Sequence, residues 1–351
     1  MPNSHRIRAD TISMSPTPAR GVRFHSSLYP TLHRHIYIQI LTSPLPIAHR
    51  TLIVRELKGL QDIISFSAVH PHMTEGGWHF PTPTDNLPGL NAIPDPLYNS
   101  TRLSDLYFRA NPNYEGRYTV PVLWDKKQET IVNNESSEII RMLYTEFDDF
   151  VDDKYKGVEF LKGKREEIDE LNAWVYDGIN NGVYKSGFAT FVPSPTLRGP
   201  RIQERHGVTV KLTRFLDSTQ EAYDKAVKIL FDSLDRAEQV LANSTGPYLF
   251  GDELTEADIR LYVTIIRFDP VYVQHFKCNI RDIRSGYPKI HKWLRHLYWD
   301  IPAFKNTTQF DHIKKHYTKS HTQINPHVSC PWWGRGYPEL GNIFALIIKD
   351  F

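Results

Sequence analysis

The sequence predicts a chain of two domains, an α/β domain followed by a domain built only of helices. A strand-like stretch, a helical stretch and a second strand-like stretch follow one another at Ile36–Leu41, Ala48–Leu60 and Ile63–Val69. A further strand, Val120–Asp125, opens at a proline and is followed by a short hairpin partner. From residue 148 onward the apolar residues recur with the period of helices, so we expect no more strands.

The first three stretches form a βαβ unit. Ile36–Leu41 is apolar and β-branched, as expected of a buried strand, and a right-handed crossover makes it parallel to the second strand. Apolar side chains recur at helical spacing between the strands, which predicts a helix with one apolar face. Charged residues lie between those apolar positions: Arg50, Arg55, Glu56 and Lys58. The turn Ser43–His49 leads into the helix, and we expect a ligand there because free N–H groups at a helix start attract anions.

A long connection, residues 71–118, follows the βαβ unit and is rich in Pro, Asn, Asp and Gly. A structureless loop of this length in a compact domain is usually either functional or wrongly assigned. Beyond it, Glu129–Val132 is the predicted hairpin partner of the third strand. Asn134–Ser137 then precede an apolar helix, Ile139–Phe147, and can cap it, while the Glu135 carboxylate can also accept a hydrogen bond from an amine.

The second domain contains several predicted helices. They are Ser218–Ala242, Thr255–Arg267, Tyr287–Leu297 and Ile301–His316. Two of them begin at a capping box, Ser218-x-x-Glu221 and Thr255-x-x-Asp258. Such a cap stabilises a helix by ~1 kcal/mol and carries no chemistry.

The composition argues against several classes of function. A length of 351 residues and a net charge of +2 fit two ordinary domains and give no argument for a nucleic-acid partner. No apolar run approaches the ~20 residues of a membrane span, so we expect no membrane association. Two cysteines exclude a disulfide scaffold and suit a reducing compartment, so we expect a cytoplasmic protein. The 16 histidines show no metal-ligand spacing, so we expect no metal site.

The stretch Ala48–Pro71 resembles the opening of the glutathionyl-hydroquinone reductases, the Xi-class and omega-like glutathione transferases. The resemblance covers Ala48–Thr190 and Ser218–His327. It implies the glutathione transferase architecture, with a thioredoxin-like domain over residues 36–142 and an all-helical domain over residues 143–327. It also implies a homodimer.

Three blocks fall outside the resemblance: the chain before Ala48, an insertion at residues 191–217, and a divergent tail at residues 328–351. We expect residues 1–35 to be irregular. The blocks are either inserted segments or translated intron and flanking sequence. Sequencing the amplified transcript decides between these origins.

The resemblance departs at the catalytic position. The family carries Cys-Pro-Trp-Ala-His-Arg at this turn, whereas this chain carries Leu45–Ile47, read Leu-Pro-Ile, before Ala48. Leu45 therefore stands where the family has its cysteine, and it cannot form the thiolate that the family reaction uses. The string Cys330–Trp332 repeats the lost motif, but no strand precedes it and no periodic helix follows it. We interpret that string as a coincidence.

The resemblance also implies residues for the glutathione side of the site. They are Trp78, Arg117, Val120, Pro121, Glu135 and Ser136. In thioredoxin-like folds the proline is cis, the backbone beside it pairs with glutathione, and the Glu-Ser pair holds the γ-glutamyl end. Two alternatives stay open at this point. The Glu-Ser pair can be a bare helix cap, and Arg117 can be a solvated loop arginine.

Three tyrosines match family positions by motif: Tyr184 in NNGVYK, Tyr272 in RFDPVY and Tyr317 in KKHYTKSH. A phenol can donate to a quinone oxygen while its ring stacks on an aromatic substrate. The alternative is that each ring packs with its hydroxyl at the surface, which is common in a chain with 18 tyrosines.

The implied function is glutathione-dependent reduction of glutathionyl-hydroquinones with release of glutathione disulfide. Glutathione is the implied co-substrate, and aromatic quinone or hydroquinone conjugates are the implied partners. Because Leu45 replaces the nucleophile, we expect this chain to bind glutathione and to have little or no reductase activity. Two alternatives stay open: a non-catalytic protein that binds glutathione or aromatic ligands, and a transferase that conjugates glutathione.

Overall fold

The structure is a computed structural model, and it describes residues 37–41, 45–85, 87, 92–189 and 220–329. The segment 1–35, which we expect to be irregular, the insertion 191–217 and the string Cys330–Trp332 lie outside the described residues. Only the first two residues of the tail lie within them.

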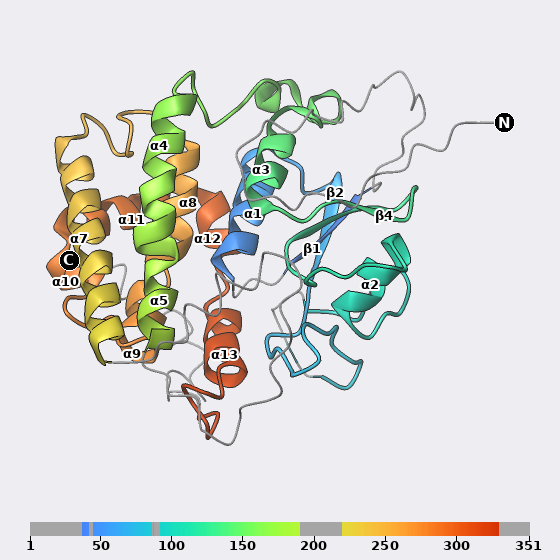
Figure 1. Cartoon of the computed structure of the whole chain (residues 1–351). Helices are drawn as coiled ribbons and strands as arrows, with labels where there is room; N and C mark the ends of the chain where they lie inside the picture. Colours follow the sequence, from blue (N-terminus) through green and yellow to red (C-terminus); the bar gives the residue numbers. More distant parts are fainter. Residues whose placement is uncertain (1–36, 42–44, 86, 88–91, 190–219, 330–351) are drawn as a thin grey trace. The chain divides into compact units, whose positions relative to one another are not determined.

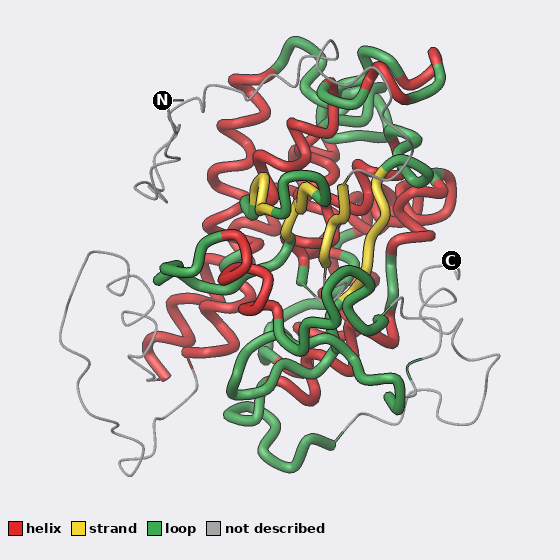
Figure 2. The backbone as a smooth tube through the Cα atoms, turned by 90° about the vertical axis from the view of Figure 1, so that its right-hand side faces the viewer, coloured by secondary structure: helices red, strands yellow, loops and turns green. Residues whose placement is uncertain are grey.

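A four-stranded sheet forms the α/β domain, in the order β2-β1-β3-β4. Its strands are β1 (Tyr37–Leu41), β2 (Ile64–Ala68), β3 (Val122–Asp125) and β4 (Thr130–Asn133). β1 pairs parallel with β2, which confirms the predicted βαβ unit, and β3 pairs antiparallel with both β1 and β4. The predicted hairpin is therefore confirmed. Figure 2 shows these strands, in yellow, lying side by side.

The helices are labelled in Figure 1. They are α1 (Pro46–Leu57), α2 (Leu103–Ala110), α3 (Ser136–Thr145), α4 (Arg165–Val175), α5 (Gly182–Ala189), α7 (Gln220–Asn243), α8 (Glu256–Ile265), α9 (Val273–His275), α10 (Ile283–Gly286), α11 (Pro288–Asp300), α12 (Pro302–Thr307) and α13 (Phe310–Ser320). Short 3-10 turns lie at Asp148–Phe150 and Asp153–Tyr155, and π-helical turns at Tyr176–Asn180 and Phe268–Tyr272. The domain limits 36–142 and 143–327 stay predictions.

The capping and helix predictions have mixed outcomes. The capping box at Thr255 is confirmed, because Asp258 Oδ2 accepts from the Thr255 N–H at 2.9 Å and from its hydroxyl at 2.9 Å. Ser218 lies outside the described residues. The single helix predicted at Ile301–His316 is wrong, because the backbone becomes extended at Thr308 and separates α12 from α13.

The long connection contains a helix, α2, that the sequence reading did not predict. It has only eight residues, and it starts after Arg102, which is not a usual capping residue. Asp105 supplies the cap instead, accepting from the Arg102 N–H at 2.9 Å. The Leu103 N–H donates to the Trp78 carbonyl at 3.0 Å, so the start of α2 is fixed against the first part of the connection.

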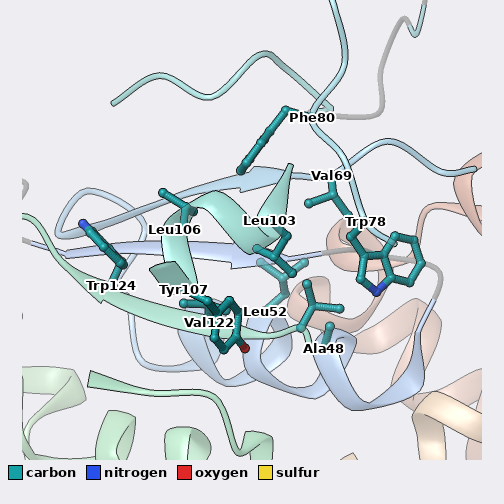
Figure 3. Close-up of a cluster of buried hydrophobic side chains, with 11 residues drawn as sticks. Ala48, Leu52, Val69, Trp78, Phe80, Leu103, Leu106, Tyr107, Val122 and Trp124 are labelled. Atoms are coloured by element: carbon teal, nitrogen blue, oxygen red, sulfur yellow. The ribbon is translucent and has the colours of Figure 1, made fainter. Parts of the chain in front are cut away.

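A buried apolar cluster lies between α1, α2 and the strands (Figure 3). Its members are Ala48, Leu52, Val69, Trp78, Phe80, Leu103, Leu106, Tyr107, Val120, Val122 and Trp124. Burying a side chain of this size contributes roughly 1.5–3 kcal/mol relative to leaving it exposed. Two of the predicted glutathione-side residues, Trp78 and Val120, belong to this cluster and are therefore held in place by core packing.

The prediction that α1 has one apolar face and one charged face is wrong. Arg50, Arg55 and Lys58 are all buried, and α1 contacts α3, α8 and α12 as well as the sheet side. The Arg55 guanidinium donates to the Ile64 carbonyl of β2. The Lys58 ammonium donates to the Asp148 carboxylate at 2.9 Å and to two backbone carbonyls, those of Tyr155 at 2.6 Å and Val158 at 3.0 Å. Buried charges are tolerated only when they are paired in this way.

Candidate functional site

The start of α1 is the first part of the site. Leu45 is the residue that precedes the helix, and its backbone is extended, with φ −85° and ψ 131°. Pro46 takes the first helical position, where its missing N–H costs nothing. The Leu45 side chain is half-buried and packs against the apolar cluster described above. The expected position of a thiol thus holds an apolar side chain, which supplies no nucleophile.

The peptide bond between Val120 and Pro121 is cis, as the resemblance implied. It directly precedes β3, and Val120 is buried. The backbone of this pair is therefore held at the start of β3, an inner strand of the sheet, by the apolar cluster.

The Glu135-Ser136 pair begins α3. Glu135 precedes the helix, and its Oε1 accepts from the Ser137 N–H at 3.2 Å and from the Ser137 hydroxyl at 3.1 Å. Ser136 is buried and donates its hydroxyl to the same oxygen at 3.4 Å. Glu135 itself is exposed, so its carboxylate caps the helix while facing solvent. A cap is present as predicted, but its acceptor is the Glu135 carboxylate and not a serine or asparagine side chain. This arrangement is compatible with a second role in binding an amine.

Trp78 and Arg117 differ sharply in their surroundings. The indole of Trp78 is buried in the apolar cluster, with its ring 5.2 Å from that of His316. The Arg117 side chain is exposed, and its carbonyl accepts from the Tyr114 hydroxyl at 3.1 Å. Trp78 is therefore held in place by core packing, whereas Arg117 lies on a loop.

The three predicted tyrosines meet at one point. The Tyr184 and Tyr317 hydroxyl oxygens are 2.7 Å apart, and those of Tyr272 and Tyr317 are 2.9 Å apart. They come from α5, from the π-helical turn Phe268–Tyr272 and from α13. Tyr272 and Tyr317 are fully buried, so the alternative in which each hydroxyl lies at the surface is wrong for them. We call these three residues the tyrosine trio.

The trio can donate hydrogen bonds but is a poor source of protons or anions. Burial, followed by the neighbouring hydroxyls, holds the pKa of each phenol well above its usual value. All three phenols are therefore neutral at physiological pH. The hydroxyls of the trio are hydrogen-bonded to one another, Tyr184 to Tyr317, Tyr272 to Tyr317 and Tyr184 to Tyr272. A hydroxyl can rotate and donate to an external acceptor in place of one of these bonds. A quinone or hydroquinone oxygen is an acceptor of this kind.

A buried pair connects α1 to the trio. Arg267 directly precedes the turn that carries Tyr272, and its Nη1 donates to His49 Nδ1 at 3.2 Å and to the Val263 carbonyl. Because a guanidinium can only donate, the His49 proton is on Nε2, which lies 3.0 Å from Thr307 Oγ1. Burial first, and then the Arg267 charge, hold the His49 pKa well below its usual value. His49 belongs to the stretch Ala48–Arg50 that matches the family motif, but the motif alone predicted no role for it.

The family comparisons agree with this geometry. The model described as "Glutathione S-transferase, N-terminal domain" matches residues 46–146, and the one described as "Glutathione S-transferase, C-terminal domain" matches residues 220–296. The glutathione S-transferase omega-like 2 of Schizosaccharomyces pombe is 52% identical over 294 residues, covering 83% of this chain and 82% of the relative. The glutathionyl-hydroquinone reductase YqjG of Escherichia coli is 47% identical over 292 residues, covering 83% and 76%.

The chain belongs to the glutathionyl-hydroquinone reductase family, the Xi-class glutathione transferases. The crystal structure of the Xi transferase from Phanerochaete chrysosporium matches it with a TM-score of 0.74 and 49% identity, covering 87% of this chain and 92% of that one. The glutathione-bound structure of YqjG matches with a TM-score of 0.71 and 45% identity, covering 86% of each chain. These matches confirm the predicted fold, a thioredoxin-like domain followed by a helical domain.

The described residues of this Xi-class chain include neither a membrane-spanning helix nor a metal-binding cluster. No helix there is long and apolar enough to cross a membrane. No group of histidine, cysteine or carboxylate side chains there could hold a metal ion. Cys278 is buried and lies far along the sequence from Leu45, where the family has its cysteine. Burial raises the pKa of the Cys278 thiol to about 12, which suits a packing role.

Proposed function

We propose that this chain binds glutathione at the start of α1 and places the aromatic ring of a glutathionyl-hydroquinone against the tyrosine trio. The observation that carries the proposal is the meeting of three phenols from three separate elements, at 2.7 and 2.9 Å. Such a cluster of buried neutral donors suits an uncharged or phenolic oxygen on an apolar ring. Relatives named glutathionyl-hydroquinone reductase support the same class of ligand.

The glutathione side of the proposed site uses groups from three segments. The backbone beside Pro121 pairs with the cysteinyl part of the tripeptide. Glu135 and Ser136 bind its γ-glutamyl end, since a carboxylate can accept from the amine and a hydroxyl can donate to a carboxylate. Trp78 forms an apolar wall, and Arg117 pairs with a carboxylate of the ligand.

The family reaction needs a protein thiolate that this chain lacks at position 45. In that reaction the thiolate attacks the sulfur of the conjugate, the bond from sulfur to the aromatic carbon breaks, and that carbon takes a proton. A second glutathione then resolves the protein–glutathione disulfide and leaves as glutathione disulfide. Leu45 forms no such disulfide. The chain therefore binds both ligands but converts the conjugate slowly or not at all.

A binding protein is therefore the second candidate function, and the packing of Leu45 into the apolar cluster favours it. Conjugation of glutathione is the third. It is disfavoured as far as the trio is concerned, because phenols with raised pKa values do not supply a phenolate to activate the glutathione thiol.

The Leu45→Cys variant tests the proposal, with Leu45→Ser as its matched control. Each is mixed with glutathione and a glutathionyl-hydroquinone, and release of the free hydroquinone and of glutathione disulfide is followed. We expect turnover with Leu45→Cys only, because the serine hydroxyl has the polarity but not the acidity of a thiol. Equal inactivity of both variants, with intact folding, would contradict the proposed reductase site.

The homodimer and the cytoplasmic location stay predictions that rest on the family. Sedimentation of the purified chain tests the first of them. Fluorescence microscopy of a tagged chain tests the second.

A further inference from the structure

Tyr107 lies on α2, outside the residues assigned to the site above, yet its hydroxyl bonds to the residues that directly precede Val120 and Glu135. The side chain is buried, with 1% of its surface exposed. Its ring packs in the apolar cluster and against the rings of Tyr114 and Tyr118, with centroids 4.8 and 5.5 Å away (Figure 3 shows Tyr107 in the cluster). The ring is therefore fixed by packing, and the hydroxyl has a defined position.

All the hydrogen-bonding capacity of that hydroxyl is used by two segments. It donates to the Thr119 carbonyl at 2.8 Å and accepts from the Thr119 N–H at 3.2 Å. It also accepts from the Asn134 side-chain amide at 3.1 Å. A phenol offers one hydrogen and two acceptor positions, so these three bonds satisfy it completely.

The two segments are the ones that carry the proposed glutathione contacts. Thr119 directly precedes Val120 and the cis peptide bond, and Asn134 directly precedes the Glu135 cap of α3. In addition, the Leu103 N–H at the start of α2 donates to the Trp78 carbonyl at 3.0 Å. A single short helix thus contacts the segments of Trp78, of Val120 and of Glu135.

We propose that Tyr107 is a positioning residue that sets the spacing between the two halves of the glutathione site. This inference rests on the proposed function. One half, beside Pro121, takes the cysteinyl part of the tripeptide, and the other, at Glu135 and Ser136, takes the γ-glutamyl end. A ligand that spans both halves gains from their fixed spacing, because the protein does not have to order them on binding. A ligand that occupies one half gains nothing from it.

Titration calorimetry with two ligands tests this on the unchanged chain and on Tyr107→Phe. S-methylglutathione spans both halves, while the dipeptide cysteinylglycine reaches only the half beside Pro121. We expect Tyr107→Phe to weaken S-methylglutathione about tenfold, the loss typical of one buried hydrogen-bonding group. Cysteinylglycine should change by less than about twofold, since it does not use the spacing. A merely destabilised fold would weaken both ligands alike.

Tyr262→Phe is the matched control. Tyr262 is also fully buried, and its hydroxyl is bonded to Thr308 at 3.0 Å, but it contacts none of the proposed glutathione residues. The Tyr262→Phe variant should bind S-methylglutathione as tightly as the unchanged chain does. Asn134→Ala is the second test variant, at a half-buried position, and should weaken the same ligand by roughly threefold.

The outcomes are distinguishable. If the unchanged chain binds no S-methylglutathione, the proposed function fails and this inference fails with it. If the unchanged chain binds but Tyr107→Phe and Asn134→Ala bind equally well, the proposed function stands and the positioning role is overturned. Parallel losses for the tripeptide and the dipeptide would also overturn it.

Discussion

Arg267 Nη1 lies 3.2 Å from His49 Nδ1, and this buried contact joins two segments that are 218 residues apart. His49 is in the second turn of α1, close to the start of the helix, while Arg267 directly precedes the turn that carries Tyr272. The pair therefore ties the glutathione side of the proposed site to the tyrosine trio. For the proposed site we therefore expect the position of an aromatic ligand relative to glutathione to depend on this tie.

Replacing His49 with alanine should lower the free energy of unfolding by about 2–4 kcal/mol, because it leaves the buried Arg267 without one acceptor and opens a cavity. His49→Gln retains an amide acceptor and donor, so we expect a smaller loss. Urea unfolding at neutral pH measures both variants. Equal stability of His49→Ala and the unchanged chain would show that the buried contact contributes nothing.

Stability should fall as the pH drops below the ordinary histidine pKa. Burial lowers the pKa of His49 well below its usual value, and that of His312 to about 3, so the unfolded chain binds protons that the folded chain does not. The contribution of each is present above about pH 6.5 and declines below it by up to about 1.4 kcal/mol per pH unit.

Urea unfolding at pH 7.5 and pH 5.0 measures this loss for the unchanged chain and for His49→Gln. The glutamine cannot titrate, so its variant should lose less stability between the two pH values. An identical loss in both proteins would mean that His49 is not protonated on unfolding in this range.

Tyr317→Phe should weaken the binding of an aromatic ligand more than either single change at the other members of the trio. Tyr317 takes part in the bonds at 2.7 and 2.9 Å, so its removal breaks two hydrogen bonds of the trio, and we expect a roughly tenfold loss of affinity. Menadione-derived glutathionyl-hydroquinone in a fluorescence quenching titration is a suitable probe. Tyr298→Phe, another buried tyrosine but on α11, is the control and should bind unchanged.

Lys58→Met should lower the free energy of unfolding by about 3 kcal/mol. It leaves the Asp148 carboxylate and two carbonyls without the buried ammonium that they share. Lys156→Met is the matched control, because Lys156 is exposed and its ion pair with Asp153 lies in solvent. The urea midpoint should move for the first variant and stay in place for the second.

The sequence predicted the parts of the fold whose causes are local. The βαβ unit follows from apolar patterns in neighbouring segments, and the Thr255 and Glu135 caps follow from residues within one turn of each other. The tyrosines were named by motif, but their meeting depends on three elements, two of which lie 133 residues apart. Periodicity carries no signal for such a distance.

What the sequence did not predict depends on distant partners. The pattern predicted a charged face at Arg50 and Lys58, because the segments that bury these side chains come from other parts of the chain. Helix α2 is too short for a periodic pattern, and the residue that precedes it is an arginine and not a usual capping residue. Tyr107 carried no motif, and its role emerges only through partners 12 and 27 residues away.

Titration calorimetry of glutathione into the purified, unchanged chain tests the central claim most directly. We predict saturable binding of one tripeptide per chain, lost when Glu135 and Ser136 are both replaced by alanine and retained when the exposed Glu138 of the same helix is replaced. No heat of binding, or binding that the double replacement leaves unchanged, would contradict the account.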